Sequence, residues 1–127
     1  MHHNEITAAI IETSIKIHRR LGPGLLESVY RKILAYELRK DGFQIHEEQA
    51  IPVVWEEVRL ELGFRADLIV NGMVIVETKS VEAVHPVHKK QLLTYLRLTD
   101  KRVGLLINFN VELLKNGISR VVNNLQE

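Results

Sequence analysis

The chain has 127 residues, of which 46% are hydrophobic and 26% are charged. These values are ordinary for a globular protein and predict a single domain over residues 1–127. The absence of cysteine excludes disulfides and thiolate zinc sites, and it fits a cytoplasmic protein. Seventeen Lys and Arg against sixteen Asp and Glu give a net charge of +1, so no overall basic excess marks a non-specific binder of nucleic acid. No run reaches the ~20 apolar residues of a membrane span, and the first residues lack the apolar core of a signal peptide.

Two helices are predicted at the beginning of the chain. Apolar residues at helical spacing indicate the first, which we expect to run from Asn4 as its N-cap to about Arg20. Residues 22–24, Gly-Pro-Gly, then break the chain, and a second helix is predicted over about residues 25–40 with Gly42 as its C′ residue. This second helix is expected to be mostly buried, because it carries two neighbouring stripes: Leu26, Val29, Ile33 and Tyr36 in one, and Glu27, Tyr30, Leu34 and Leu38 in the other.

The middle of the chain favours strands. Residues 43–62 predict short strands, in which Pro52 indicates an edge strand or a strand start and Glu56-Glu57 a turn. The apolar runs on either side of Asn71-Gly72 then predict a hairpin over residues 64–79.

The last third of the chain returns to mixed structure. Pro86 suits the first turn of a third helix over about residues 87–98. Residues 103–108 form a continuous apolar run and predict a buried strand, whereas residues 118–122 fit either a last strand or a short helix. This order of elements predicts an α/β (α+β) fold in which helices flank a mixed sheet.

Charged residues lie near the ends of the two strands of the predicted hairpin. Asp67 belongs to the first strand, and Glu77 and Lys79 end the second. Two carboxylates and the nearby Thr78 carbonyl make an oxygen-rich site that suits Mg²⁺ or Mn²⁺. Lys79 could orient an attacking water or stabilise developing charge, and these are the parts needed to hydrolyse a phosphodiester. The alternative is an ordinary strand end whose acids form ion pairs, Asp67 with Arg65 for example.

The turn of this hairpin decides whether the acids can share an ion. A two-residue Asn71-Gly72 loop would point Asp67 and Glu77 to opposite faces of the sheet. A three-residue loop over residues 70–72 would place Asp67 on the face of Glu77 and Lys79, with Gly at the position that suits a G1 bulge. Asn-Gly alone favours the shorter turn, but the chemistry of the acids leads us to predict the three-residue register or an equivalent bulge.

A third acid, Glu27, lies in the first turn of the second helix. Its simplest role is to complement the helix dipole and pair with Arg31. The glycines of residues 22–24 could instead let the helix begin close to the sheet, where Glu27 would complete an acidic cluster. Tyr30 shares its face and could hydrogen-bond the cluster and its substrate, or simply pack.

Polar residues also form one face of the third helix. His88, Gln91 and Tyr95 fall at i, i+3 and i+7, while Leu92, Leu93 and Leu96 are expected to face the core. Such a face is often only solvated, but here it follows Lys79 by about ten residues and could border the same site. His88, Lys89 and Lys90 place positive charge at the helix start, which suits substrate phosphates.

The remaining histidines are weaker candidates. His85 and His88 have the spacing of a zinc pair but lack further ligands of the right kind. His18, near the end of the first helix, is expected to be a dipole partner or a packed histidine.

Several segments together resemble the GxxExxY protein family. The signature corresponds to Gly24-Leu25-Leu26-Glu27-Ser28-Val29-Tyr30, and the segments that surround it also look like this family: Ile17–Gly24, Pro86–His88, Gln91–Leu98 and Gly104–Phe109. The likeness covers nearly the whole chain. That family is placed in the PD-(D/E)XK nuclease superfamily, so the resemblance implies a restriction-endonuclease-like core with a mixed central sheet flanked by helices.

The resemblance also implies roles for individual residues. By motif, Glu27, Asp67 and Glu77 would be the metal ligands and Lys79 the catalytic lysine, while Gln91 and Tyr95 resemble the Q-x-x-x-Y motif of exonuclease-type members. Here Glu-Thr-Lys stands where Glu-Leu-Lys is common, and no proline precedes Asp67.

These observations predict a Mg²⁺- or Mn²⁺-dependent nuclease. Its expected substrate is nucleic acid, DNA rather than RNA, and no association with a membrane is expected. Two alternatives remain open: a nuclease-like module that binds nucleic acid without cutting it, and a scaffold or assembly protein whose charged strand ends form a dimer seam. A homodimer is compatible with the enzyme as well, because cutting both strands of a duplex often needs two copies.

Overall fold

The structure is a computed structural model that describes residues 2–125, apart from the side chain of Leu62. In chain order its elements are α1 (His3–Leu21), α2 (Glu27–Lys40), β1 (Ile45–Trp55), β2 (Val58–Val70), β3 (Val74–Lys79), α3 (Pro86–Thr99), β4 (Val103–Asn108), the 3₁₀ helix η1 (Leu114–Gly117) and β5 (Ile118–Val122). The five strands form one sheet in the order β1-β2-β3-β4-β5. Only the β3–β4 pair is parallel, and the other three pairs are antiparallel. The predicted mixed sheet is therefore confirmed, and residues 118–122 form a strand.

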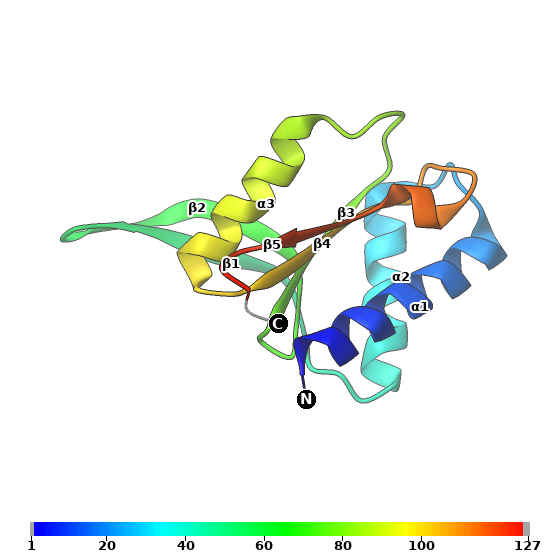
Figure 1. The fold of residues 1–127 in the computed structure, drawn as a ribbon, viewed down its shortest axis with the longest axis horizontal. Coiled ribbons are helices and arrows are strands. Elements are labelled where there is room, and N and C mark those ends of the chain that lie inside the picture. The colour runs from blue at the N-terminus through cyan, green and yellow to red at the C-terminus, as the bar shows by residue number, and fades with distance from the viewer. Residues whose placement is uncertain (1, 126–127) are drawn as a thin grey trace.

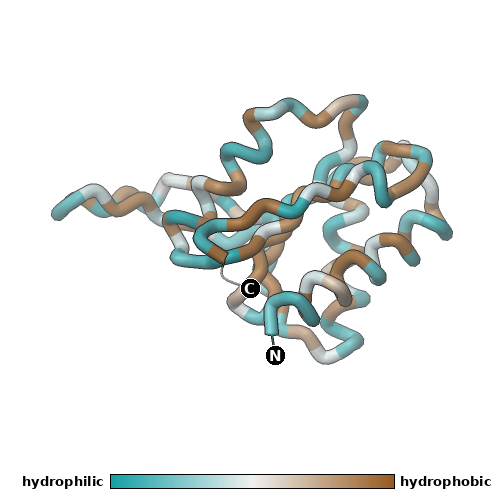
Figure 2. Tube along the Cα trace, in the orientation of Figure 1, coloured by the Kyte–Doolittle hydropathy of each residue, from teal (hydrophilic) through white to brown (hydrophobic). Residues whose placement is uncertain are grey.

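Helices cover both faces of this sheet (Figure 1). One core joins α1 and α2 to one face, with Ile10, Leu34 and Val76 among its members. A second core joins α3 to the other face, where Leu92 and Leu96 pack against the sheet. The central strands β3 and β4 lie between the two cores, and the tube coloured by hydropathy shows hydrophobic residues along them (Figure 2).

The ends of the first two helices differ in part from the prediction. Asn4 is not the N-cap of α1, because the helix begins earlier, at His3, and the Nδ1 atom of His2 accepts a hydrogen bond of 3.1 Å from the Asn4 amide. Helix α2 ends as predicted. Gly42 has a φ of 94°, and the Phe43 amide donates to the Leu38 carbonyl at 3.0 Å, which closes the helix with a Schellman-type end.

Helix α2 buries most of one predicted stripe and leaves much of the other exposed. Tyr30, Leu34 and Leu38 have no exposed surface, as the prediction of a buried helix requires. Leu26 and Tyr36, from the other predicted stripe, are 74% and 62% exposed. The expectation that both stripes are buried was therefore wrong, because α2 packs on the sheet and α1 with one side only.

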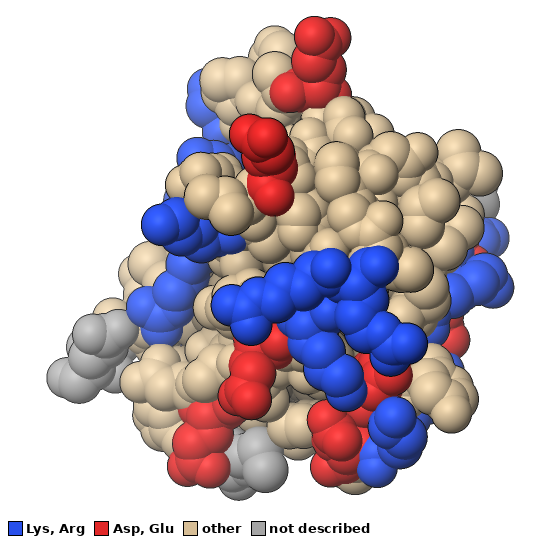
Figure 3. Space-filling model, turned by 90° about the vertical axis from the view of Figure 1, so that its right-hand side faces the viewer, with Lys and Arg blue, Asp and Glu red and all other residues tan. Residues whose placement is uncertain are grey.

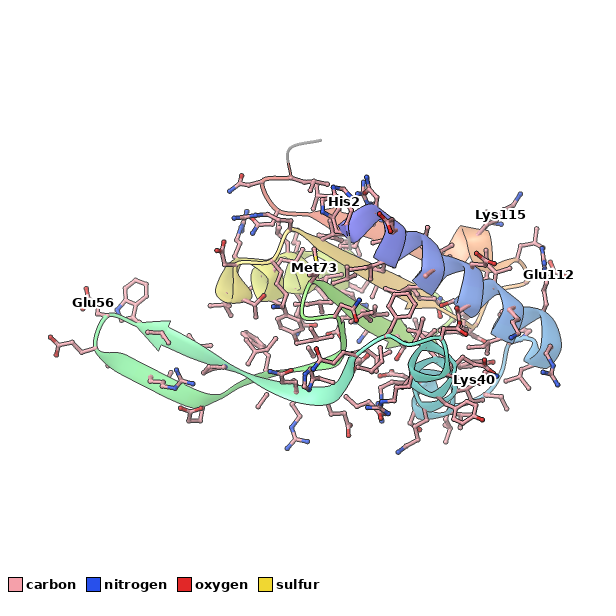
Figure 4. All side chains as sticks on the ribbon, turned by 90° about the horizontal axis from the view of Figure 1, so that it is seen from below. His2, Lys40, Glu56, Met73, Glu112 and Lys115 are labelled. Atoms are coloured by element: carbon pink, nitrogen blue, oxygen red, sulfur yellow. The ribbon has the colours of Figure 1, made fainter. Side chains whose placement is uncertain are left out.

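The predicted short strands of residues 43–62 belong to two long strands of 11 and 13 residues. Residues 52–63 extend beyond the body of the molecule as a hairpin arm, with Glu56 at its tip, far from Lys40 at the end of α2 (Figures 1 and 4). The turn at Glu56-Glu57 and the edge position of β1 are confirmed, and the register shifts at Pro52, between Ile51 and Val53. No helix among the described residues is long and apolar enough to cross a membrane.

Candidate active site

The hairpin between β2 and β3 has a register that places Asp67 and Glu77 on the same face of the sheet. Val70 pairs with Val74 and Leu68 with Val76, so three residues, 71–73, form the loop. Asn71 and Gly72 both have positive φ, and the Met73 amide donates to the Val70 carbonyl at 3.0 Å. The three-residue loop is thus confirmed, but it is shifted by one residue. Asn-Gly makes its preferred tight turn and Met73 is the additional residue.

This register brings Asp67 opposite Glu77, at the point where the ladder between β2 and β3 ends. The Asp67 amide donates to Oε2 of Glu77 at 2.8 Å, and the Thr78 amide donates to Oδ2 of Asp67 at 2.8 Å. The Thr78 hydroxyl adds a contact of 3.2 Å to the same oxygen. Each acid therefore accepts a hydrogen bond from a backbone amide of the opposite strand through one of its oxygens, so the two carboxylates are held side by side.

The two acids repel each other in a largely buried place. Glu77 is only 7% exposed. Burial, followed by the negative charge of Asp67, raises the pKa of Glu77 to about 8, while the Lys79 ammonium counteracts this. The phenol of Tyr95 lies within electrostatic range of the same charges, because burial and then Glu77 and Asp67 raise the pKa of Tyr95 to about 12. A site that holds excess negative charge in this way favours a cation.

Glu27 is positioned by the Gly-Pro-Gly loop before α2. The buried Tyr30 hydroxyl donates to the Gly22 carbonyl at 2.5 Å and accepts from the Leu25 amide at 3.2 Å. From the end of β3, the Ser80 hydroxyl donates to the Leu25 carbonyl at 2.6 Å. These bonds hold the start of α2 against the end of β3. Gly22 and Gly24, with φ of 71° and 104°, allow the chain to turn there.

Glu27 therefore lies within electrostatic range of the pair. Burial and then the charge of Asp67 raise the pKa of Glu27, whereas Lys79 and Arg31 lower it. Within residues 2–125, however, no group of three or more His, Asp or Glu side chains is close enough to hold a metal ion jointly. The structure thus closely joins Asp67 and Glu77, with Glu27 near them but separate.

The predicted residues of α3 divide into two groups. Tyr95 is buried, and its ring is tilted against that of Phe64 with centroids 4.6 Å apart. Burial and then the charges of the acid pair raise the pKa of its phenol. His88 is half-buried near Lys79, since burial and then the Lys79 charge lower the pKa of His88. Lys89, Lys90 and Gln91 are exposed on the same helix.

Tyr30 has a different environment from the one that substrate contact suggests. It has no exposed surface and stacks on Phe109 with ring centroids 4.5 Å apart. Its hydroxyl is committed to the loop before α2. The structure therefore gives Tyr30 the task of holding that loop.

Sequence reasoning missed the residues that fix the exit of β3. The buried Asn108 accepts from the Val81 amide at 3.1 Å and donates to the Val81 carbonyl at 2.9 Å, and the Phe109 amide donates to the Lys79 carbonyl at 2.9 Å. Together with Ser80, these bonds determine where Lys79 leaves the sheet. An amide side chain at the end of a wholly apolar strand was the available signal for Asn108.

Other histidines and cavities lie outside this site. His18 is a packed histidine whose Nε2 atom lies 2.7 Å from the Val111 carbonyl oxygen. Beside it, a cavity of about 380 Å³ lies between the end of α1 and η1, and none of the predicted site residues line it. The side of the molecule that carries these helices shows Lys and Arg gathered among Asp and Glu (Figure 3).

A comparison with known protein families places the chain in one of them. The model of the family described as the PD-(D/E)XK nuclease superfamily matches residues 4–121. The chain belongs to this superfamily, and its mixed sheet flanked by helices is consistent with a restriction-endonuclease-like fold. No curated protein and no solved structure matches the chain. Membership suggests a nuclease-like function, while the GxxExxY family stays a prediction.

Proposed function

We propose that this protein is a metal-dependent nuclease that hydrolyses phosphodiester bonds of DNA or a related nucleic acid. The observation that carries the proposal is the reciprocal contact of Asp67 and Glu77, in which each carboxylate binds one amide of the opposite strand. A structural ion pair would place a positive charge between the strands. This site instead joins two acids, with the Lys79 ammonium close enough to lower the pKa of Glu77.

The chemistry of these donors fits a divalent cation. Burial and mutual repulsion favour a proton on Glu77 in the metal-free protein, and a hard cation of two charges can replace that proton. Asp67, Glu77 and the Thr78 carbonyl would hold Mg²⁺ or Mn²⁺, with Glu27 bound through a water molecule. When bound, such an ion supplies Lewis acidity and a more acidic water.

The remaining residues act on the substrate and the water. Lys79 orients the attacking water and neutralises charge that develops on the phosphoryl oxygens. Tyr95 is protonated at neutral pH, as a tyrosine ordinarily is, and burial and the acid pair raise its pKa further, so its phenol can donate a hydrogen bond. The nucleic-acid backbone is contacted by polar residues of the first half of α3, namely His88, Lys89, Lys90 and Gln91. Tyr30 positions Glu27, because its hydroxyl holds the loop before α2.

Cleavage by purified wild type and Lys79→Met protein tests the proposal. Each is incubated with single- and double-stranded DNA and RNA in Mg²⁺, in Mn²⁺ and in EDTA. Loss of the ammonium should reduce metal-dependent cleavage by roughly 10²- to 10³-fold, whereas Lys32→Met, an exposed change on α2, should leave it unaltered. Equal cleavage by wild type and Lys79→Met would contradict the proposal. Binding without any cleavage would favour the inactive nucleic-acid-binding module.

A further inference from the structure

Two Arg–Glu pairs connect α2 to β1, and they differ in kind. The Nη1 atom of Arg39 donates to Oε2 of Glu47 at 2.8 Å, and its Nη2 atom donates to the Ile45 carbonyl at 3.0 Å. Two nitrogens of this guanidinium near the surface therefore have hydrogen-bond partners. Arg31 lies 3.5 Å from Glu48, and its side chain is only 10% exposed. Its Nε atom is buried and has no hydrogen-bond partner within the described part of the chain. Arg31 is therefore a buried guanidinium whose Nε donor is unused.

The position of Arg31 links it to the candidate active site. It follows Glu27 by one turn of α2, and the charges of Arg31 and Asp67 both act on Glu27. On the other side, Glu48 falls opposite Asp67, because its neighbours Glu47 and Gln49 pair with Leu68 and Ala66. Arg31 thus lies between two residues that both adjoin Asp67.

A buried arginine that keeps an unpaired donor and only one long ionic contact can still bind an anion. Guanidinium is always charged, and its planar set of five donors matches the oxygens of a phosphate. Glu48 is a poor permanent partner, because its side chain is 52% exposed, its distance is long and its backbone has a φ of 49°, which is costly for a residue with a Cβ atom. An incoming phosphate can displace such a carboxylate without unpacking α2.

We propose that Arg31 binds a phosphate group of the nucleic-acid substrate beside the acid pair, and that Glu48 occupies the guanidinium until the substrate arrives. This inference rests on the proposed function for the identity of the substrate. The phosphate can be an internal phosphodiester or a terminal phosphate. Arg31 is a substrate-binding residue in this account, and Glu48 acts as its competitor.

Binding of a fluorescent single-stranded DNA oligonucleotide, measured by anisotropy in EDTA so that no cleavage occurs, tests the proposal. Arg31→Met should weaken binding at least tenfold and reduce the slope of log K against log salt by about 0.7, the value for one phosphate contact on a single strand. Arg31→Lys, which keeps the charge and guards against loss of the fold, should weaken it less. Glu48→Gln removes the competitor and should tighten binding about threefold, a direction that a purely structural ion pair does not give.

The second Arg–Glu pair provides matched controls on the same helix and strand. Arg39→Met and Glu47→Gln should leave binding within about twofold of wild type. Oligonucleotides with a 5′-phosphate and a 5′-hydroxyl separate the two phosphate sources, since only a terminal-phosphate site prefers the former.

The inference fails if Arg31→Met and Arg39→Met have equal effects, if Glu48→Gln does not tighten binding, or if wild type does not bind. Cleavage in Mg²⁺ is measured in parallel. If the predicted binding pattern is seen but no protein cleaves, the nuclease proposal is wrong and Arg31 is still a phosphate site. If the protein cleaves and Arg31→Met changes neither cleavage nor binding, the nuclease proposal stands and the Arg31 proposal is wrong.

Discussion

Asp67→Asn is expected to lower metal-dependent cleavage by roughly 10³-fold or more, because the charge that attracts the cation is halved. The amide side chain has nearly the same shape, and its oxygen can still accept the hydrogen bond that Asp67 receives from the Thr78 amide. We therefore expect the fold to survive while the activity is lost. Cleavage rates at several Mn²⁺ concentrations measure the effect, and circular dichroism verifies the fold.

Asp100→Asn is the matched control for this change. Asp100 ends α3 in the left-handed region, at φ 53°, which Asn adopts readily, and its carboxylate is paired with the exposed Arg102. Its replacement should leave cleavage unchanged. An Asp67→Asn protein that is folded and cleaves at the wild-type rate would exclude Asp67 from the active site.

The metal-free protein is expected to lose stability as the pH rises from about 4.5 to about 8. Burial raises the pKa of Glu77 to about 8 from its ordinary value of 4.5. Below pH 4.5 the carboxyl group is protonated in both states, whereas between these values the unfolded chain releases a proton that the folded protein retains. The free energy of unfolding should therefore decrease over this range, by about 3 to 5 kcal/mol, and stay level above it.

Urea denaturation in EDTA at pH 5 and pH 8.5 measures this loss. Glu77→Gln should remove most of the difference, because the amide does not titrate, and Glu57→Gln at the exposed turn of the hairpin arm should not. Adding Mn²⁺ at pH 8.5 should stabilise wild type and leave Glu77→Gln nearly unaffected. Identical pH profiles for wild type and Glu77→Gln would show that Glu77 is not held in the repulsive environment described above.

The sequence predicted that Asp67 and Glu77 lie close together on one face of the hairpin, but it did not predict the exact register of β2 against β3. The need for both acids to share a face selected the three-residue loop, which the structure has. The choice between residues 70–72 and 71–73 depends on which turn Asn71-Gly72 adopts, and its preference for a tight turn determined the outcome. The reciprocal hydrogen bonds, from the Asp67 amide to Glu77 and from the Thr78 amide to Asp67, could not be predicted, because they form where the pairing of β2 with β3 ends.

Features that depend on tertiary packing were also beyond sequence reasoning. Both predicted stripes of α2 carry large apolar residues, so only the position of α1 and the sheet decides that Leu34 is buried and Leu26 exposed. Arg31 looked like a helix-surface partner of Glu27, and only the fold shows that its side chain is buried against β1. Lys79 and Tyr95 could be named as candidates without coordinates, and the structure places both within electrostatic range of Glu77.

The central claim is that Asp67 and Glu77 jointly hold a divalent cation. A crystal soaked in Mn²⁺, with diffraction data collected near the manganese absorption edge, tests this most directly. We predict an anomalous peak bound by carboxylate oxygens of both acids, and its absence from crystals of the Asp67→Asn protein treated in the same way. An empty site in the wild type, or manganese bound only elsewhere, would contradict the claim and with it the proposed hydrolysis.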